Sequence, residues 1–323
     1  MPITVVGSIA FDAVKTPFGE RERMLGGAAV HFALAASFFQ EVRVVGPVGE
    51  DFGEAELDVL RRRGVDVSDV ERIAGGKTFF WRGEYGWDLN SRDTLDTQLG
   101  VFEGFQPKLS QRSRSSEVLF LANIQPDLQR EVRAQLPDAR FVALDSMNLW
   151  IDIARDSLLS AIASVDCVIL NDAELRQLTG KPNLLTAARE LLSLGDGSPQ
   201  PGGRARGPRV IVAKQGEYGA ALITGESFFA LPAYPLETVI DPTGAGDSFA
   251  GGLLGYIAAH PSEKLSDELL RGAMAHATAL ASFNVEEFGT ERVERLTAAE
   301  IAARVEELRA ITQFSGPALQ LRY

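Results

Sequence analysis

Short apolar runs alternate with helical patterns along most of the chain, and this alternation limits its fold more than any other feature. The runs lie at residues 3–9, 42–48, 141–144, 167–170 and 210–213, and are apolar almost throughout, which is typical of strands buried on both faces. Helical spacing marks residues 28–39, 53–63, 173–178, 184–194 and 248–260. Strands that alternate with helices form right-handed βαβ units. We therefore predict a three-layer α/β fold in which helices cover a mostly parallel sheet.

The length and the charge of the chain limit the number of domains and the kinds of partner that it can bind. With 323 residues the chain can bury a substantial core, and we expect one domain over residues 1–323. Its net charge of −12 argues against a surface for nucleic acid or anionic lipid, because such surfaces depend on Lys and Arg. No apolar run reaches the ~18 residues of a membrane span, and no basic lead-in opens the chain. We expect a soluble cytoplasmic protein without nucleic-acid or membrane partners.

Residues 77–105 break the alternation, because they show a strand pattern without helical period. Phe79, Trp81, Tyr85 and Trp87 fall on odd positions there. A strand sends alternate side chains to opposite faces, so this segment has one aromatic face. We interpret it as a small sheet projecting from the main domain. The aromatic face either packs on the protein itself, closes over a site as a lid, or mediates self-association.

Two other segments have no chemical role that the sequence defines. Residues 195–208 are rich in Gly and Pro, which predicts a flexible surface loop. The last residues, from about 313 to 323, carry no pattern. Cys167 is the only cysteine, which excludes an intramolecular disulfide, and it lies in an apolar run that favours a core position.

The segment Asp-Pro-Thr-Gly-Ala-Gly-Asp at residues 241–247 carries the clearest chemical signal. Gly244, Ala245 and Gly246 allow a tight turn into the helix that follows. The first amides of a helix lack intrahelical partners and lie at the positive end of its dipole, so this turn predicts an anion site. Asp247 then either takes a proton from an attacking hydroxyl or caps the helix.

The run DPTGAGDSFAGG at residues 241–252 closely resembles the C-terminal signature of the ribokinase-like, or PfkB, family of carbohydrate and nucleoside kinases. Further motifs follow in the family's order: GSIAFD at 7–12, GGAAVH at 26–31, GPVGED at 46–51, NDAE at 171–174 and KQG at 214–216. The resemblance spans roughly residues 3–290. It implies the ribokinase-like α/β/α fold with a small β lid, whose elements lie at about 12–25 and 77–105.

The resemblance also implies an activity, the ATP-dependent transfer of a phosphoryl group to a hydroxyl of a small sugar, polyol or nucleoside. Asp247 would be the catalytic base. The amides of Gly244, Ala245 and Gly246 would form the anion hole. The nucleotide side would be formed by Asn171, Glu174, Lys214, Gly216 and Asn284. Glu174 would hold Mg²⁺ through water, since Mg²⁺ usually keeps several waters. Many members are activated by potassium, which would lie near Asp241 and Thr243.

The resemblance also implies which residues bind the acceptor, and two positions depart from the family's pattern. Asp12, Gly26 and Gly27 would hold the acceptor hydroxyls, and Gln125, after a predicted strand, is a further candidate. His31 stands where sugar kinases commonly carry Asn, and it is either a substrate contact or a satisfied helix histidine. Lys214 replaces a common Thr, and it either adds a charge near the phosphates or points to solvent.

Other functions remain as alternatives. A catalytically weak sugar- or nucleotide-binding sensor on the same fold would keep the architecture, and vitamin kinases of the same superfamily share it. Lid surfaces in this family often pair, which predicts a homodimer through the lid. Other phosphate motifs fail on spacing: the Gly that a Walker A loop requires five residues before Gly76 is Glu71, and no Gly-x-Gly-x-x-Gly follows the first strand.

Overall fold

The computed structural model describes residues 1–195, 207–261 and 264–313. Most of the segment predicted as a flexible loop at 195–208, and the tail after residue 313, lie outside these ranges. Within them, no helix is both long and apolar enough to cross a bilayer.

The centre of the molecule is a sheet of nine strands in the order β13-β12-β11-β10-β9-β8-β1-β4-β5. From β11 to β5 all neighbours pair in parallel, and β12 and β13 add antiparallel pairs at one edge. The strands are β1 (Ile3–Val6), β4 (Val42–Val48), β5 (Asp66–Arg72), β8 (Val118–Leu121), β9 (Phe141–Asp145), β10 (Cys167–Asn171), β11 (Val210–Lys214), β12 (Ala220–Ile223) and β13 (Phe228–Leu231). The predicted parallel sheet is confirmed.

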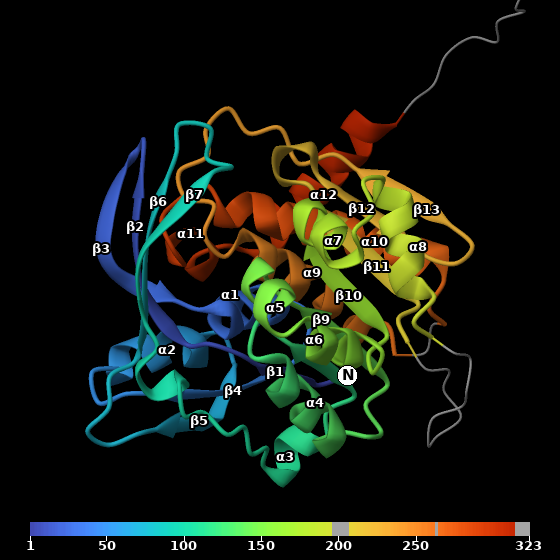
Figure 1. Cartoon of the computed structure of the whole chain (residues 1–323). Coiled ribbons are helices and arrows are strands. Elements are labelled where there is room, and N and C mark those ends of the chain that lie inside the picture. The colour runs from blue at the N-terminus through green and yellow to red at the C-terminus, as the bar shows by residue number, and fades with distance from the viewer. Residues whose placement is uncertain (196–206, 262–263, 314–323) are drawn as a thin grey trace, which may run out of the picture.

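Helices cover both faces of this sheet, as Figure 1 shows. One face carries α1 (Ala28–Ala36), α2 (Glu54–Arg62), α9 (Ala245–Ala259) and α10 (Asp267–Asn284), with α11 (Glu291–Glu294) and α12 (Ala298–Thr312) beside them. The other carries α4 (Pro126–Gln135), α5 (Asn148–Ile153), α6 (Arg155–Ile162), α7 (Asp172–Thr179) and α8 (Leu184–Leu192), with α3 (Gln111–Arg114) nearby. The predicted three-layer α/β/α architecture is confirmed.

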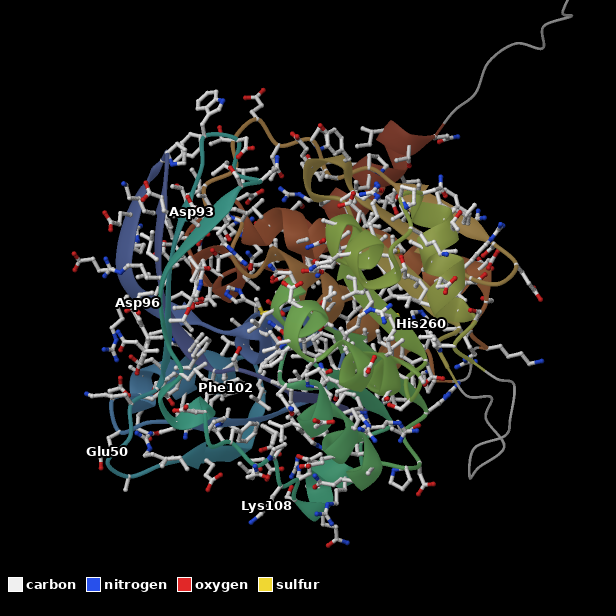
Figure 2. All side chains as sticks on the ribbon, in the orientation of Figure 1. Glu50, Asp93, Asp96, Phe102, Lys108 and His260 are labelled. Carbon is white, nitrogen blue, oxygen red and sulfur yellow. The ribbon has the colours of Figure 1, made fainter. Side chains whose placement is uncertain are left out.

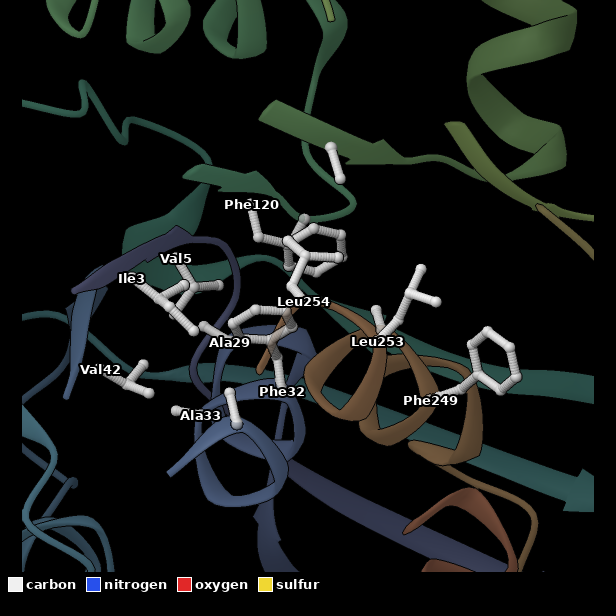
Figure 3. Packing of buried hydrophobic residues seen from close by; sticks show 14 of the residues in the cluster. Ile3, Val5, Ala29, Phe32, Ala33, Val42, Phe120, Phe249, Leu253 and Leu254 are labelled. Atoms are coloured by element: carbon white, nitrogen blue, oxygen red, sulfur yellow. The ribbon is translucent and has the colours of Figure 1, made fainter. Parts of the chain in front are cut away.

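The core divides at the sheet because successive strand residues face opposite layers. In β8, Val118 and Phe120 join the core under α1 and α9, while Leu119 and Leu121 join the core under α4 to α8. Phe32 of α1 stacks on Phe120 with ring centroids 4.4 Å apart. Figure 3 shows these two rings with the α9 side chains that complete the layer. This packing fixes α1 and α9, the two helices whose first turns form the site described below.

A second sheet of four strands projects from one side of the domain (Figure 1). Its order is β3-β2-β6-β7, built from β2 (Ala10–Thr16), β3 (Gly19–Gly26), β6 (Phe79–Tyr85) and β7 (Arg92–Gln98), and the short 3-10 helix η1 (Gly100–Phe102) follows it. All residues of β7 are exposed, and Figure 2 shows Asp93 and Asp96 on this edge strand. The predicted small sheet is confirmed.

The aromatic face of residues 77–105 proves to be divided. Tyr85 is buried, and Trp81 packs beside it against Val14 and Phe288. Trp87 lies beyond the end of β6 and is 90% exposed. The inner aromatics thus pack on the protein itself, in the space between the small sheet and the main domain.

Candidate active site

Asp241 fixes the loop that leads into α9. Its carboxylate is fully buried and accepts two backbone hydrogen bonds, from the amide of Thr243 at 2.9 Å and from the amide of Gly289 at 3.0 Å. Burial raises the pKa of Asp241, and these hydrogen bonds offset part of the rise. The amide group of Asn284 donates a further bond of 2.7 Å to the carbonyl of Thr243. The loop is therefore held rigidly from two sides.

Gly244 ends this loop as the N-cap residue of α9. Its φ of 75° lies in the left-handed region, which an L-residue adopts only at a cost. No side chain caps the helix. The Ala245 amide donates a long bond of 3.3 Å to the carbonyl of Pro242, and no acceptor for the Gly246 amide is found among the described residues. The first turn of α9 therefore presents donors to an incoming anion.

His31 of α1 packs directly against this turn. A Cβ atom at Gly244 would lie 2.4 Å from three atoms of the His31 ring. His31 Nδ1 donates a 3.0 Å hydrogen bond to Asn284 Oδ1, because the Asn284 nitrogen donates to the Thr243 carbonyl and leaves the oxygen as acceptor. The same oxygen accepts from the Ser248 hydroxyl at 2.9 Å. Burial lowers the pKa of His31 to about 4, so the ring is neutral at physiological pH. Asn284, predicted on the nucleotide side, is used here to join α1, α9 and α10.

Asp247 lies at the third position of α9, one turn beyond Gly244. It does not cap the helix, which removes one of the two alternatives that the sequence allowed. Enclosure by the protein and the charge of Asp145 raise the pKa of Asp247 to about 7, while Lys214 and its own amide lower it. A carboxylate with a pKa near the working pH suits proton transfer.

Asp145 is a residue that the sequence analysis did not identify. It ends β9, one residue past the apolar run at 141–144, and its side chain is only 8% exposed. Its Oδ2 lies 3.3 Å from Nζ of Lys214, which ends β11. Burial raises the pKa of Asp145, and Lys214 offsets part of the rise. Lys214 therefore does not point to solvent, as one of the two predictions for it supposed.

Asn171 and Glu174 stand between these two residues, at the end of β10. Asn171 is the N-cap of α7, and its side chain accepts a 2.7 Å bond from the amide of Glu174. Glu174 Oε2 accepts a 2.8 Å bond from the amide of Asn171 in return, which completes a capping box. Burial raises the pKa of Glu174, and Lys214 lowers it. One oxygen, Oε1, is left outside the capping box.

The predicted acceptor residues lie where β2 and β3 meet the first turn of α1. Asp12 is 5% exposed, and a Cβ atom at Gly26 would lie 1.9 Å from Asp12 Oδ2, so only glycine fits beside the carboxylate. Burial, with contributions from Asp241 and Asp247, raises the pKa of Asp12 to about 7, and the Gly27 amide lowers it by hydrogen bonding. The charges of Asp12 and Asp247 are thus coupled.

The other two predicted residues have local roles. Gln125 caps α4, because its side-chain oxygen accepts a 3.1 Å bond from the amide of Leu128 while its nitrogen donates to Asp127. Gly216 begins the 3-10 helix η2 (Gly216–Tyr218) after β11, with a φ of 57°.

The small sheet is tied to this site at two points. The hydroxyls of Tyr85 on β6 and of Thr243, in the loop before α9, lie 3.2 Å apart. At the tip of the small sheet, the side-chain nitrogen of Asn90 donates a 3.5 Å hydrogen bond to Glu217, the residue after Gly216. The charge of Arg92 on β7 lowers the pKa values of Asp12, Tyr85 and Glu174. The small sheet therefore lies over the residues predicted for the acceptor and those predicted for the nucleotide, as a lid does.

Comparison with known proteins places this geometry in a family. Residues 3–295 match the family described as "pfkB family carbohydrate kinase". The chain belongs to the pfkB family of carbohydrate kinases. The predicted kinase class is thereby confirmed.

Individual members of the family give the extent of the similarity. A cytidine kinase of Thermococcus kodakarensis is 31% identical over 271 residues, which cover 82% of this chain and 91% of that protein. A fructokinase of Klebsiella pneumoniae is 26% identical over 278 residues, covering 80% and 85%. The crystal structure of a Methanocaldococcus jannaschii nucleoside kinase, an archaeal member of the ribokinase family, aligns with a TM-score of 0.75 and 19% identity, covering 95% and 98%. The ribokinase-like fold of this pfkB kinase is thereby confirmed.

Proposed function

We propose that this pfkB kinase transfers the γ-phosphoryl group of ATP to a hydroxyl of a nucleoside. The main support is the geometry of the loop before α9, which we call the anion-hole loop (residues 241–246): the open first turn of α9 contains Asp247 and lies beside Lys214. The nucleoside acceptor is supported by the similarity to a cytidine kinase. A free sugar such as fructose is the second candidate, supported by the similarity to a fructokinase.

In this mechanism Asp247 accepts the proton of the acceptor hydroxyl as its oxygen attacks the γ-phosphorus. The new oxygen–phosphorus bond forms while the bond from the γ-phosphorus to the bridging oxygen breaks, and ADP leaves. The amides of Gly244, Ala245 and Gly246 bind the phosphoryl oxygens, on which negative charge develops. Asp12 accepts hydrogen bonds from other hydroxyls of the acceptor and so orients the one that reacts.

The magnesium ion that such a transfer requires fits the residues present. Within the described ranges, no group of three or more His, Cys, Asp or Glu is arranged as a metal site. Mg²⁺ in kinases is held mainly by phosphates and waters with one or two carboxylates, which matches a single open oxygen on Glu174. Bound there, the ion would neutralise charge on the triphosphate. Asn171, Gly216 and Asn284 would shape the nucleotide side around it.

A monovalent cation such as K⁺ belongs to the same proposal. Each oxygen of the Asp241 carboxylate accepts one amide hydrogen and keeps another lone pair, and Thr243 adds a hydroxyl. Turnover in KCl should therefore exceed turnover in LiCl at equal ionic strength. Equal rates in both salts would contradict a cation at this loop.

A panel of acceptors tests the proposed reaction. ADP release from Mg²⁺-ATP is measured with cytidine, other nucleosides, ribose, fructose, inositols and vitamin alcohols, and the phosphorylated product is identified by mass spectrometry. Turnover with a nucleoside supports the proposal, and turnover with fructose alone assigns the second candidate. ATP binding without turnover on any acceptor would instead favour the sensor, the alternative that the sequence left open.

We also propose that the lid mediates a homodimer. The support is the fully exposed edge strand β7, on which Leu95 is 56% exposed among charged neighbours. An unpaired edge strand is a template for pairing with a second copy. Light scattering should give twice the mass of the 34.9 kDa chain for the parent and the monomer mass for Leu95→Asp. A monomeric parent would contradict the dimer.

A further inference from the structure

Lys214 reaches across the carboxyl edge of the sheet instead of extending from its own strand into solvent. It ends β11, and its ion-pair partner Asp145 ends β9, with β10 between the two strands. The ammonium must therefore pass over the end of β10 to lie 3.3 Å from the Asp145 carboxylate. The lysine side chain is 20% exposed, and the carboxylate is 8% exposed.

The same ammonium lies against the anion hole. A Cβ atom at Gly246 would lie 2.9 Å from Lys214 Nζ. Because Gly246 is in the first turn of α9, the ammonium is beside the backbone donors that an incoming phosphoryl group would meet. The absence of a side chain at Gly246 leaves room for both the lysine and a phosphoryl oxygen.

The charges that act directly on Lys214 come from three elements. Asp145 of β9, Glu174 of α7 and Asp247 of α9 all interact with it, and Arg92 of the lid acts on Glu174 from the other side. Asp12 of β2 and Asp241 of the anion-hole loop add negative charge on the acceptor side. Burial alone would lower the pKa of Lys214, but its three carboxylate neighbours raise it, so the ammonium stays charged.

Structural stability does not explain this arrangement. A buried ion pair contributes little net stability, because the loss of solvation of both charges offsets their attraction. Phosphoryl transfer, in contrast, needs positive charge at the oxygens of the group in transfer, and side-chain cations there raise the rate strongly.

We propose that Lys214 is a further catalytic residue of this kinase, whose ammonium binds the oxygens of the γ-phosphoryl group during its transfer, and that Asp145 is a positioning residue that holds the ammonium beside Gly246. This inference rests on the proposed function. Lys214 keeps its proton throughout, since the proton of the acceptor goes to Asp247. When the triphosphate binds, the ammonium donates to the phosphoryl oxygens with its remaining N–H groups while Asp145 keeps it in place.

Kinetics of Lys214→Met, Lys214→Arg and Asp145→Asn test the proposal, each measured with the acceptor that the panel identifies. Lys214→Met should lower kcat about 100-fold with less than about threefold change in the acceptor KM, because the ammonium contacts the phosphoryl group in transfer and not the acceptor. Lys214→Arg should recover part of the loss. Lys15→Met is the matched control, since it breaks an exposed ion pair with Glu84 on the lid and should leave kcat unchanged.

The pH profile separates a catalytic role from a structural one. Lys214 lowers the pKa of Asp247 and Asp145 raises it, so the ascending limb of kcat/KM should move to higher pH in Lys214→Met and to lower pH in Asp145→Asn. A kcat within threefold of the parent in Lys214→Met would overturn the proposal. The proposal would also be overturned if Lys214→Met lost kcat and a matching amount of thermal stability while the ascending limb of its pH profile stayed at the parent's pH.

A binding measurement keeps this inference separate from the proposed function. In titration calorimetry without acceptor, the parent should bind a non-hydrolysable ATP analogue more tightly than ADP, and Lys214→Met should lose most of that difference. If the affinities for the ATP analogue and for ADP differ by the same factor in the parent and in Lys214→Met, the role of Lys214 at the γ-phosphate is overturned. Parent-like turnover of Asp247→Asn would instead refute the assignment of the base, whatever Lys214→Met shows.

Discussion

Gly244→Ala tests whether the proposed anion hole needs both its left-handed turn and its contact with His31. The backbone at this position has a φ of 75°, and the added methyl group would lie 2.4 Å from the His31 ring. The ring cannot move away freely, because its Nδ1 is bonded to the buried Asn284. The substitution therefore forces either the loop or the α1 side chain to shift.

The expected loss in the free energy of unfolding is the sum of two separate costs. An L-residue in the left-handed region costs roughly 1–2 kcal/mol. An extra methyl in a packed contact costs roughly a further 1–3 kcal/mol. Gly180 supplies a matched control: its φ of 69° is similar, but a Cβ atom there would have nothing within 4 Å. Gly180→Ala should therefore show the first cost only, and Gly244→Ala about 2–5 kcal/mol in total.

Urea unfolding followed by circular dichroism gives both free energies. Adding His31→Ala to Gly244→Ala should reduce the penalty of the glycine substitution by at least about 1 kcal/mol, since the two residues are in contact. The kcat of Gly244→Ala should also fall about 100-fold, because the amide donors move. If Gly244→Ala costs no more than Gly180→Ala and keeps its kcat, the described geometry of the anion hole is wrong.

Three further predictions address the lid, the core and pH. Tyr85→Phe removes the 3.2 Å contact with the Thr243 hydroxyl and should raise the acceptor KM several-fold while costing about 1 kcal/mol of stability; unchanged kinetics would show that the lid closes without it. Phe32→Ala should lower the free energy of unfolding by about 3–5 kcal/mol, because its ring is fully buried against Phe120; a loss below 1 kcal/mol would contradict this packing. The folded-state pKa of Asp247 is about 7, well above its ordinary value of 3.8, so the folded chain binds more protons between these values and its stability should fall as pH rises from about 4 to 7. Asp247→Asn should therefore unfold at a higher temperature than the parent at pH 8. A lower Tm of the variant at pH 8 would contradict the raised pKa.

The sequence predicts the fold well because strand burial is a local pattern. β4 matches its predicted range of 42–48, and the other four predicted strands begin at the predicted residue. β1 is shorter than predicted, since the chain leaves the sheet after Val6 and enters the second sheet at Ala10. Edge strands such as β5 were not predicted, because their half-exposed residues lack a continuous apolar run.

The sequence predicted candidate site residues only where they lie in one motif, and it missed contacts between distant segments. Asp145 had a local signal, an acidic residue directly after an apolar run, yet its partner Lys214 is 69 residues away. The bond between His31 and Asn284 joins residues 253 apart, and no periodicity encodes such a contact. The pairing of Asn171 with Glu174 as the cap of α7 is local by comparison, since the two residues are three positions apart.

The central claim is that Asp247 is the base beside the anion hole, and one comparison tests it most directly. The kcat of Asp247→Asn is measured with the best acceptor of the panel, together with the affinity for ADP by calorimetry. Loss of a general base should lower kcat by about 10²–10⁴ while the ADP affinity stays within about threefold of the parent, because the amide keeps the shape of the site. Turnover near the parent rate would contradict the account.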